Sequence, residues 1–400
     1  MALSTLPPAP ASPASSGLAL AHMGTFPPTQ CGLATFGAAL VTAMSDVSPS
    51  TRLGIIDVVD GTDRTGPVDP RVATRLVNGV PASRKGAADF ANGHDALVIE
   101  HEFGIYGQHD GVALLEVLDD ITIPVVTVLH TVPQSPTAHQ RSIIERLAIG
   151  CDALIVMSGA AHDRLLCSYA VDAASVHVVP HGAHPNPPRI GERPRGQRPL
   201  VLTWGLLGPG KGIEVAIDSM ALLRDVIPLP RYLVAGETHP KVLAASGEQY
   251  RDSLRRRAVQ RGVGDMVDFD SSYRDVDSLN ALVRSADLVL LPYESREQVT
   301  SGVLIEAVAS ERPVVATDFP HARELLIPGA GLVVPHEDPV EMARAVKLAL
   351  CDQRLAASMR ASARRVASSA MWPAVARRYL DIARQCVHQR GHEVQRGQVA

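Results

Sequence analysis

The chain has 400 residues, 46% of them hydrophobic, and a formal net charge of −4, which is enough apolar material for two or three domains of about 150 residues each. Without a net positive charge it lacks the field that attracts nucleic acid or anionic membranes, so we exclude a DNA-coating or polybasic protein. No apolar run reaches the roughly 18 residues that span a bilayer, and the first basic residue is Arg52, too late for a secretory signal. We expect a cytoplasmic protein with at most peripheral membrane contact and no nucleic-acid partner.

The cysteines do not indicate a metal or redox centre. There are five, they are far apart in the sequence, and no two of them form a C-x-x-C pair. An odd, scattered set also argues against a disulfide framework. We expect reduced cysteines with a structural role.

The N-terminal half shows the pattern of a parallel α/β sheet. Residues 1–17, rich in Ala, Pro and Ser, are expected to form a disordered tail. From residue 18 to 185, apolar runs alternate with helical patterns, as in βα units. The predicted strands are LALAHMGTF, RLGIIDVV, ALVIEHEF, PVVTVLHT, ALIVMS and VHVVP, and the predicted helices lie near residues 33–44, 110–118, 139–150 and 160–169.

The C-terminal half repeats this pattern after a polar, Pro- and Arg-rich segment, 186–198, that is typical of an interdomain linker. Residues 371–388 are predicted to form a helix across both domains, before a tail at 389–400. The predicted strands within 199–370 are PLVLTWG, RYLVAG, MVDF, LVLLPY, PVVAT and GLVVP, with helices near 212–225, 248–261, 279–285, 302–310 and 340–350. We therefore predict two doubly wound, Rossmann-like domains whose ligand lies in the cleft between them, outside the carboxyl ends of the strands.

The segment GLLGPGKG, residues 205–212, has the composition of a phosphate-binding loop. Its glycines let backbone N–H groups approach an anion, the following helix N-terminus favours negative charge, and Lys211 adds a cation. It also satisfies the P-loop pattern G-x-x-x-x-G-K, but Gly212 stands where a Ser or Thr would hold magnesium. We therefore disfavour a P-loop NTPase, while a simple turn with an exposed lysine remains an alternative.

The segment from Gln298 to Asp318 contains a second candidate anion site. Ser301 and Gly302 predict a turn into a helix whose first N–H groups are free to face an anion, and Glu306 lies one turn further on. A carboxylate there can accept two hydrogen bonds from the vicinal hydroxyls of a ribose. By spacing alone, a surface helix with one glutamate remains the simpler interpretation.

Three histidines, His101, His130 and His181, lie at or just beyond the ends of predicted strands. Because the carboxyl ends of parallel strands face the cleft, all three are candidates for it. None belongs to an H-E-x-x-H or H-x-H pattern, so no metal site is predicted. The segment FPPTQCGLATF predicts another strand, loop and helix, with free N–H groups at Gly32 that face the second domain.

Together these segments resemble the retaining glycosyltransferases of family 4, which have the GT-B fold, over nearly all of residues 18–385. The resemblance implies transfer of a hexosyl group from a nucleoside-diphosphate sugar to a hydroxyl acceptor, with retention at the anomeric carbon and without a metal or other cofactor. The acceptor, whether a glycan, a lipid-linked sugar or a small molecule, is not specified. The strings that carry it are FPPTQCGLATF, HEFGIYGQHDG, LHTV, VVPHGAH, the KG loop, VAGETHP, ADLVLLPY, TSGVLIEAVASERPVVAT and HARELL.

The resemblance also implies roles for single residues. Lys211 would contact the donor diphosphate, and His130 would lie beside the sugar at the reaction centre. Gln298 and Glu306 fall on the family's two glutamates, the first binding sugar hydroxyls and the second the ribose. His130, Lys211 and Gln298 are thus the expected catalytic residues. The other donor-binding residues that it implies are Gly32, Glu237, Ser301, Gly302, Val303 and Leu304.

Two residues depart from the family pattern. Leu206 stands where the family usually has an arginine, and Gln298 where it has a glutamate. Loss of one charged hydrogen bond to a leaving diphosphate costs on the order of 2–4 kcal/mol unless another cation replaces it, for which Arg164 and Arg323 are candidates. These departures motivate an alternative, a catalytically weakened scaffold that binds a nucleotide or glycan. A phosphorylase or an epimerase on the same scaffold is a further alternative.

Overall fold

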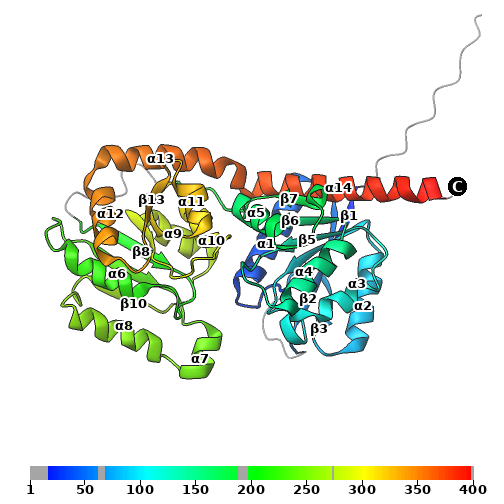
Figure 1. Ribbon diagram of the computed structural model, residues 1–400, viewed down its shortest axis with the longest axis horizontal. Helices are drawn as coiled ribbons and strands as arrows, with labels where there is room; N and C mark the ends of the chain where they lie inside the picture. Colours follow the sequence, from blue (N-terminus) through cyan, green and yellow to red (C-terminus); the bar gives the residue numbers. More distant parts are fainter. Residues whose placement is uncertain (1–16, 62–67, 188–196, 273, 398–400) are drawn as a thin grey trace, which may run out of the picture.

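The computed structural model describes residues 17–61, 68–187, 197–272 and 274–397. The predicted N-terminal tail therefore lies outside the described residues except for Gly17, as do most of the predicted linker and residues 398–400. Figure 1 shows two α/β halves side by side, joined along one face by the helices at the end of the chain. Each half is built on one parallel sheet, which confirms the predicted fold class.

The N-terminal half contains a parallel seven-stranded sheet of order β3-β2-β1-β4-β5-β6-β7. The central strands are buried on both faces because helices cover both, as their nearly continuous apolar runs predicted. Its strands are β1 (Ala19–Gly24), β2 (Arg52–Val59), β3 (Val72–Val77), β4 (Ala96–His101), β5 (Val125–Leu129), β6 (Ala153–Val156) and β7 (Val176–Val178). Its α-helices are α1 (Gly32–Val47), α2 (Pro81–Asn92), α3 (Ala113–Leu118), α4 (Ala138–Gly150) and α5 (Gly159–Ser168), with 3₁₀ turns at η1 (His109–Gly111) and η2 (Ala173–Ser175).

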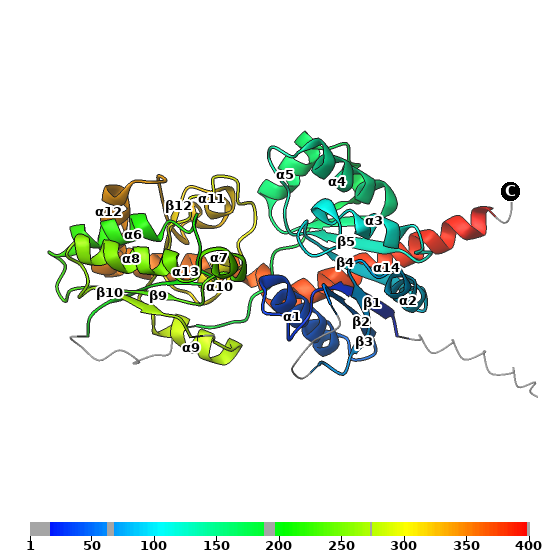
Figure 2. The same cartoon turned by 90° about the horizontal axis from the view of Figure 1, so that it is seen from below.

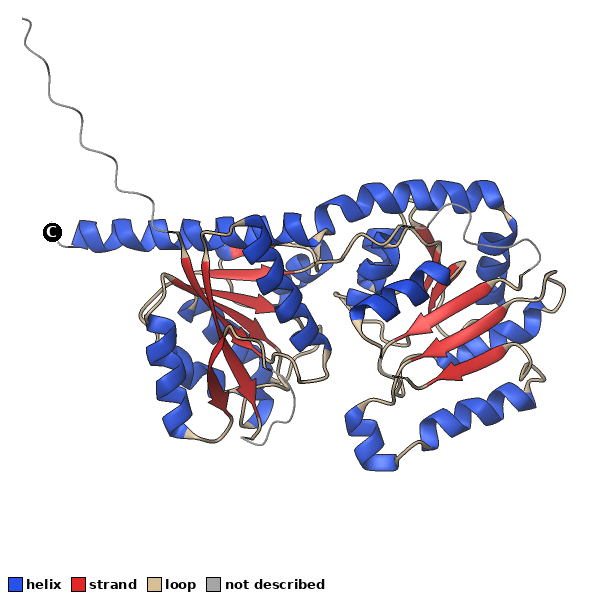
Figure 3. Cartoon of the chain, turned by 180° about the vertical axis from the view of Figure 1, so that it is seen from behind, coloured by secondary structure: helices blue, strands red, loops and turns tan. Residues whose placement is uncertain are grey.

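The C-terminal half contains a parallel six-stranded sheet of order β10-β9-β8-β11-β12-β13. In Figure 3 the arrowheads of this sheet point towards the N-terminal half, so the loops after its strands face the junction. Its strands are β8 (Leu200–Trp204), β9 (Arg231–Ala235), β10 (Val267–Asp270), β11 (Leu288–Leu291), β12 (Val314–Thr317) and β13 (Gly331–Val334). Its helices are α6 (Ile213–Met220), α7 (Pro240–Ser246), α8 (Gln249–Gln260), α9 (Val276–Ser285), α10 (Gly302–Ala309), α11 (Pro320–Leu326), α12 (Pro339–Cys351) and α13 (Gln353–Ala367), with 3₁₀ turns at η3 (Ala221–Leu223) and η4 (Ser368–Ala370).

The terminal helix α14 (Trp372–Gly397) returns to the N-terminal half, as Figure 2 shows, and packs against α1. It continues past residue 388, where the sequence pattern predicted its end. Its buried residues recur at helical spacing and join the core beneath α1, which includes Tyr379, Ala383 and Cys386. At the crossing, a methyl group on Gly182 would lie 2.1 Å from the ring of Trp372, so only glycine allows the two segments to approach this closely. Every helix in the described part of the chain is too short or too polar to span a membrane.

Candidate active site

The loop between β8 and α6 turns sharply at Gly212, its last residue. Gly212 caps α6 with a φ of 65°, and a methyl group there would lie 1.7 Å from the carbonyl oxygen of Pro292. Glycine is therefore required for this turn. The ammonium of Lys211 lies 4.6 Å from the centre of the Tyr293 ring, a distance typical of a cation–π contact. Burial lowers the pKa of Lys211, and no described carboxylate forms an ion pair with it, so an anionic ligand can fill that place.

A pocket of about 150 Å³ lies beside this loop, at the carboxyl ends of β8, β9 and β10. Leu206 and Glu237, both singled out in the sequence, line it. Arg274 also lines the pocket, where it pairs with Asp270. The full lining is Trp204, Gly205, Leu206, Ala235, Gly236, Glu237, Ser272, Arg274 and Leu279.

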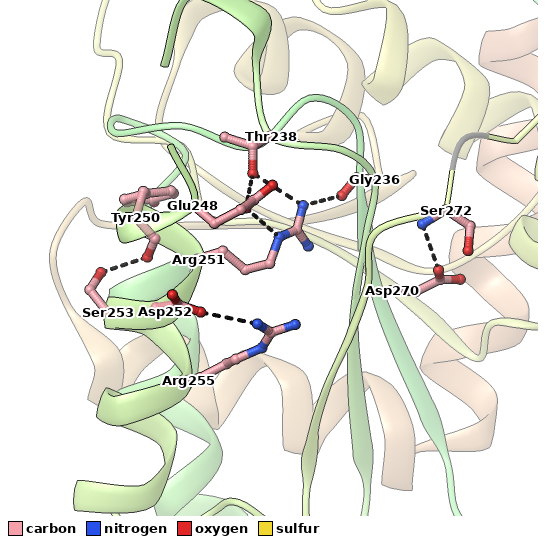
Figure 4. Close-up of polar contacts among 10 residues, drawn as sticks. All are labelled: Gly236, Thr238, Glu248, Tyr250, Arg251, Asp252, Ser253, Arg255, Asp270 and Ser272. Carbon is pink, nitrogen blue, oxygen red and sulfur yellow. Dashed lines mark hydrogen bonds and ion pairs between the residues drawn. The ribbon is translucent and has the colours of Figure 1, made fainter. Parts of the chain in front are cut away.

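A buried arginine of α8 fixes the loop that carries Glu237. Arg251 is 1% exposed, and its Nη2 donates to the carbonyl oxygen of Gly236 at 2.7 Å. Its Nε donates to Glu248 at 3.2 Å, and Glu248 in turn accepts from Thr238 at 2.6 Å. Figure 4 shows this network closing around the two residues that flank Glu237. The position of one pocket wall thus depends on a charge-assisted network.

Replacing Arg251 with methionine is expected to lower the free energy of unfolding by about 1.5–3 kcal/mol, the usual contribution of hydrogen bonds to a charged group. Urea unfolding measures this. The matched control is Arg255→Met on the same helix, because Arg255 is half exposed and makes an i,i+3 pair with Asp252. That change should cost less than about 1 kcal/mol, and equal losses for the two variants would show that the network does not hold the loop.

The start of α10 lies against the N-terminal half. Ser301 caps the helix by accepting from the backbone N–H of Leu304 at 3.2 Å, and its own N–H donates to Nδ1 of His321 at 2.9 Å. A methyl group on Gly302 would lie 2.8 Å from Nε2 of His181. The helix N-terminus, with its positive end of the dipole, is therefore placed at the junction between the two sheets.

Glu306 and Gln298 occupy different environments near this helix. Burial raises the pKa of Glu306 to about 7, although a hydrogen bond with Trp204 lowers it in part. The side-chain amide of Gln298 donates to the carbonyl oxygen of Thr300 at 3.1 Å, which leaves its carbonyl oxygen as an acceptor. Glu306 thus changes its charge near neutral pH, whereas Gln298 stays neutral.

On the N-terminal side, one buried carboxylate holds two histidines. Glu100, 1% exposed, lies 2.6 Å from His130 Nε2 and 3.1 Å from His22 Nε2, within hydrogen-bonding distance of both. Burial raises the pKa of Glu100, but the hydrogen bonds from His130 and His22 outweigh it and set the pKa at about 2. Glu100 is therefore ionised, each histidine donates Nε2–H to it, and Nδ1 of His130 remains as an acceptor.

His130 and His181 lie together, whereas His101 does not join them. The ring of Phe36, on α1, meets the rings of His130 and His181 edge-on, each at 4.9 Å between centres. Burial lowers the pKa of His181 to about 4, so this ring is neutral. His101 is fully buried, packs on Phe103, and neither ring nitrogen has a partner among the described residues. Its prediction as a cleft residue is wrong, because alternation along β4 points it to the opposite face from Glu100.

Direct hydrogen bonds join the two halves around the segment before α10. Ser158 Oγ donates to the carbonyl oxygen of Val299 at 2.5 Å, and Arg164 donates to that of Glu297 at 2.7 Å. Glu324 accepts from the first two N–H groups of α5 at 2.9 and 3.0 Å. Arg164 is thus used to tie the halves together, and Arg323 pairs with Asp318. Gly32 begins α1 with open space around its Cα, where a methyl group would meet no atom within 4 Å.

Comparison with known proteins shows a similarity to glycosyl transferases. Residues 189–366 match the family model described as glycosyl transferases group 1. D-inositol 3-phosphate glycosyltransferase of Jonesia denitrificans is 32% identical over 284 residues, which is 64% of each chain, so the match spans under two thirds of that relative. GDP-mannose-dependent α-(1-6)-phosphatidylinositol monomannoside mannosyltransferase of Mycobacterium tuberculosis is 27% identical over 271 residues, 64% of this chain and 67% of the relative.

Solved structures of similar shape confirm the predicted GT-B fold. Sucrose-phosphate synthase of Thermosynechococcus elongatus aligns with a TM-score of 0.74 at 17% identity, over 92% of this chain and 98% of that one. Anabaena HepE in complex with UDP and glucose aligns with a TM-score of 0.71 at 15% identity, over 91% and 98% of the two chains. At these identities the likeness shows the architecture alone.

Several residues of this candidate site were not predicted. Glu100 and His22 lie inside strands, where a polar residue in an apolar run is the available signal: β1 has the sequence ALAHMG and β4 the sequence ALVIEH. His321 forms a hydrogen bond with Ser301, 20 residues away, and Trp204 forms one with Glu306, 102 residues away. Such pairings depend on the tertiary fold, so the sequence pattern did not indicate them.

Proposed function

We propose that this chain transfers a hexosyl group from a nucleoside-diphosphate sugar to a hydroxyl acceptor, with retention of anomeric configuration. The observation that carries the proposal is that candidate anion-binding groups of the C-terminal half and a positioned histidine of the N-terminal half both lie at the junction of the two halves. In the C-terminal half, Lys211 is half-buried over Tyr293 and, with the N-terminus of α10, can bind an anion. In the N-terminal half, His130 is held by Glu100.

The donor's diphosphate fits between Lys211 and the N–H groups that begin α10, at Gly302, Val303 and Leu304. Negative charge grows on the leaving diphosphate as the glycosidic bond breaks, and a cation with fixed N–H dipoles stabilises it. Glu306, one turn further along α10, would accept hydrogen bonds from the ribose. The pocket beside Glu237 would receive the rest of the nucleoside.

The transferred sugar would lie between Gln298 and His130. Because its Nε2–H donates a hydrogen bond to Glu100, His130 can accept one from a sugar hydroxyl at Nδ1, which orients the sugar ring. The acceptor hydroxyl would attack from the face that the diphosphate leaves, passing its proton to the leaving phosphate oxygen. No metal is needed in this scheme, so a chelator should not reduce transfer.

Relatives and neighbours support a nucleotide-sugar donor without fixing its base. One relative is named as GDP-mannose-dependent, and one neighbour was solved with UDP and glucose. We propose UDP or GDP as the nucleotide. The acceptor is proposed as a glycan, a lipid-linked sugar or a small polyol, since relatives are named for inositol phosphate and phosphatidylinositol mannoside acceptors.

Release of nucleotide in the presence of an acceptor extract tests the proposal. Each donor is incubated with the water-soluble and lipid fractions of such an extract, and free UDP or GDP is measured along with the anomeric configuration of the product. Acceptor-dependent release with retention supports the proposal. Binding without release would indicate a weakened scaffold that only binds its ligand. Release that requires inorganic phosphate would indicate a phosphorylase, and release without an acceptor would indicate an epimerase.

Affinity for the nucleotide sugar is expected to rise roughly tenfold between pH 6 and pH 8, because the pKa of Glu306 is about 7 and the carboxylate is the better acceptor for ribose hydroxyls. Calorimetric titration at each pH measures this, and the intact nucleotide sugar is used because its diphosphate diester does not titrate in this range. Glu306→Gln should bind with a flat pH profile.

Glu306 should also make the stability of the ligand-free protein depend on pH. The pKa of Glu306 lies above its ordinary value of 4.5, so the folded state binds more protons than the unfolded state between pH 4.5 and 7, and stability falls as pH rises through this range. Glu306→Gln should flatten that slope. A wild-type affinity that is constant from pH 6 to 8 would contradict the ribose assignment.

A further inference from the structure

Three metal-ligating side chains meet at one point of the N-terminal half, separate from Lys211 and α10. His109 and Asp110 belong to η1, in the loop after β4, and His139 lies in the first turn of α4. Nδ1 of His109 is 3.1 Å from Nδ1 of His139 and 3.3 Å from Oδ2 of Asp110, and the third side of this triangle is 3.2 Å. All three atoms are therefore about equally far from one another.

This triangle has the size of one face of a zinc coordination tetrahedron. Bonds from Zn²⁺ to histidine nitrogen and carboxylate oxygen are about 2.0–2.2 Å, so neighbouring ligand atoms lie about 3.3–3.5 Å apart. The observed separations of 3.1, 3.2 and 3.3 Å require almost no movement. Without a cation, at most one proton fits between the two Nδ1 atoms, which leaves a nitrogen lone pair and a carboxylate facing the same point.

We propose that His109, Asp110 and His139 bind a divalent cation of the Zn²⁺ class. Two imidazoles and one carboxylate suit Zn²⁺ and its transition-metal neighbours, whereas Mg²⁺ and Ca²⁺ prefer sets of oxygen ligands. The His109 side chain is 79% exposed and that of His139 is 40% exposed, so the fourth coordination position faces solvent and can hold water. Asp110, at 18% exposed, forms the inner side of the site.

The fold brings together Asp110 and His139, which are 29 residues apart in sequence. Thr137 and Gln140 form a reciprocal cap that starts α4 and places His139 in its first turn. The loop after β4 turns back through Gln108 and Asp110, whose φ angles are 67° and 52°, and Gln108 donates to Glu116 on α3 at 2.8 Å. A bound cation would clamp this loop to α4, beside a pocket of about 190 Å³ that Asn78, Gln108 and Glu116 line.

The chain provides its own control for histidine-based binding. On α14, His388 and His392 are exposed and their Nε2 atoms lie 2.9 Å apart, one helical turn from each other. This pair has two ligands and no described carboxylate as a third. Cys167 and Cys351 are exposed thiols that can also take up Zn²⁺, and their thiolates would give a charge-transfer band with Co²⁺.

The test is titration of the full chain, stripped of metal with a chelator, with Zn²⁺ by calorimetry and with Co²⁺ by absorption spectroscopy. We expect one tight equivalent and a tetrahedral Co²⁺ spectrum without a thiolate band. Loss of even a hydrogen-bond partner of a metal ligand typically costs 10–100-fold in affinity, so His109→Ala and Asp110→Asn, which remove a ligand, should each weaken binding by more than about 100-fold. His392→Ala should retain the tight equivalent.

Folding is monitored in the same variants without metal. His109 is largely exposed, and asparagine tolerates positive φ as aspartate does, so both variants should melt like the wild type and lose only the stabilisation that added Zn²⁺ gives. The proposal is overturned if the wild type takes up no stoichiometric Zn²⁺, if His109→Ala and Asp110→Asn bind it as tightly as the wild type, or if the spectrum shows thiolate ligation. None of these results depends on the donor or on transfer activity.

Discussion

Lys211→Ala is expected to lower kcat/KM for the nucleotide sugar by roughly 100–1,000-fold, the effect of removing one preorganised group that stabilises developing negative charge. The effect should be at the upper end because Leu206 stands where the family usually has an arginine, and Arg164 and Arg323 are both engaged elsewhere. Calorimetry with the donor and initial rates with an active acceptor fraction measure it. The free energy of unfolding should change by less than about 1 kcal/mol, since only a cation–π contact is lost.

Lys347→Ala is the matched control, because this second lysine lies on the outer face of α12, half-exposed and paired with Asp225. It should leave donor affinity and rate unchanged. If Lys211→Ala binds the donor as tightly as the wild type, the anion site is not where we place it. If both lysine variants lose affinity equally, the effect is one of general charge.

Glu100→Gln is expected to lower the free energy of unfolding by about 1.5–3 kcal/mol, the usual contribution of hydrogen bonds to a charged group, and to reduce transfer as well. Glutamine presents one acceptor and one amide, whereas both His22 and His130 donate to the carboxylate. One imidazole N–H therefore loses its acceptor, and His130 is no longer held in one tautomer and orientation. Urea unfolding and transfer rates measure the two effects.

The pH dependence of stability gives an independent measure of the same group. The pKa of Glu100 is about 2, below its ordinary value of 4.5, so its ionisation stabilises the folded state above pH 4.5 and this contribution is lost as pH falls towards 2. Glu100→Gln should remove that part of the acid sensitivity. Glu116→Gln, at a half-exposed glutamate of α3, should change stability far less, because solvent screens its ion pair. A Glu100→Gln protein as stable and active as the wild type would contradict the positioning of His130.

The sequence predicted the fold well where strands are buried on both faces. Each of the twelve predicted apolar runs corresponds to a strand, because central parallel strands are nearly continuous apolar segments. The thirteenth strand, β3, was missed because Thr74 and Arg75 interrupt its apolar pattern and most of its residues are only partly buried, whereas the other edge strands, β7, β10 and β13, were predicted. Helix α2 was missed with it: its polar segment PASRKGAADFAN buries only three alanines.

The site could be predicted only in part. The glycine loop and the start of α10 are local features, and their spacing was enough to place Lys211 and Ser301 at turns before helices. The N-terminal side depends on long-range pairing: Glu100 meets His130 from 30 residues away and His22 from 78. His101 was selected because it is a histidine at the end of a strand, but adjacent residues on a strand point to opposite faces, and it is the neighbouring Glu100 that meets His130.

The measurement that tests the central claim most directly is a calorimetric titration of the purified chain, without added metal, against UDP, GDP and ADP and their glucose, mannose and N-acetylglucosamine conjugates. The account predicts saturable, one-to-one binding of one nucleotide and its sugar conjugate, weakened strongly in Lys211→Ala and unchanged in Lys347→Ala. Binding of none of these ligands would contradict a donor site at the junction of the two sheets.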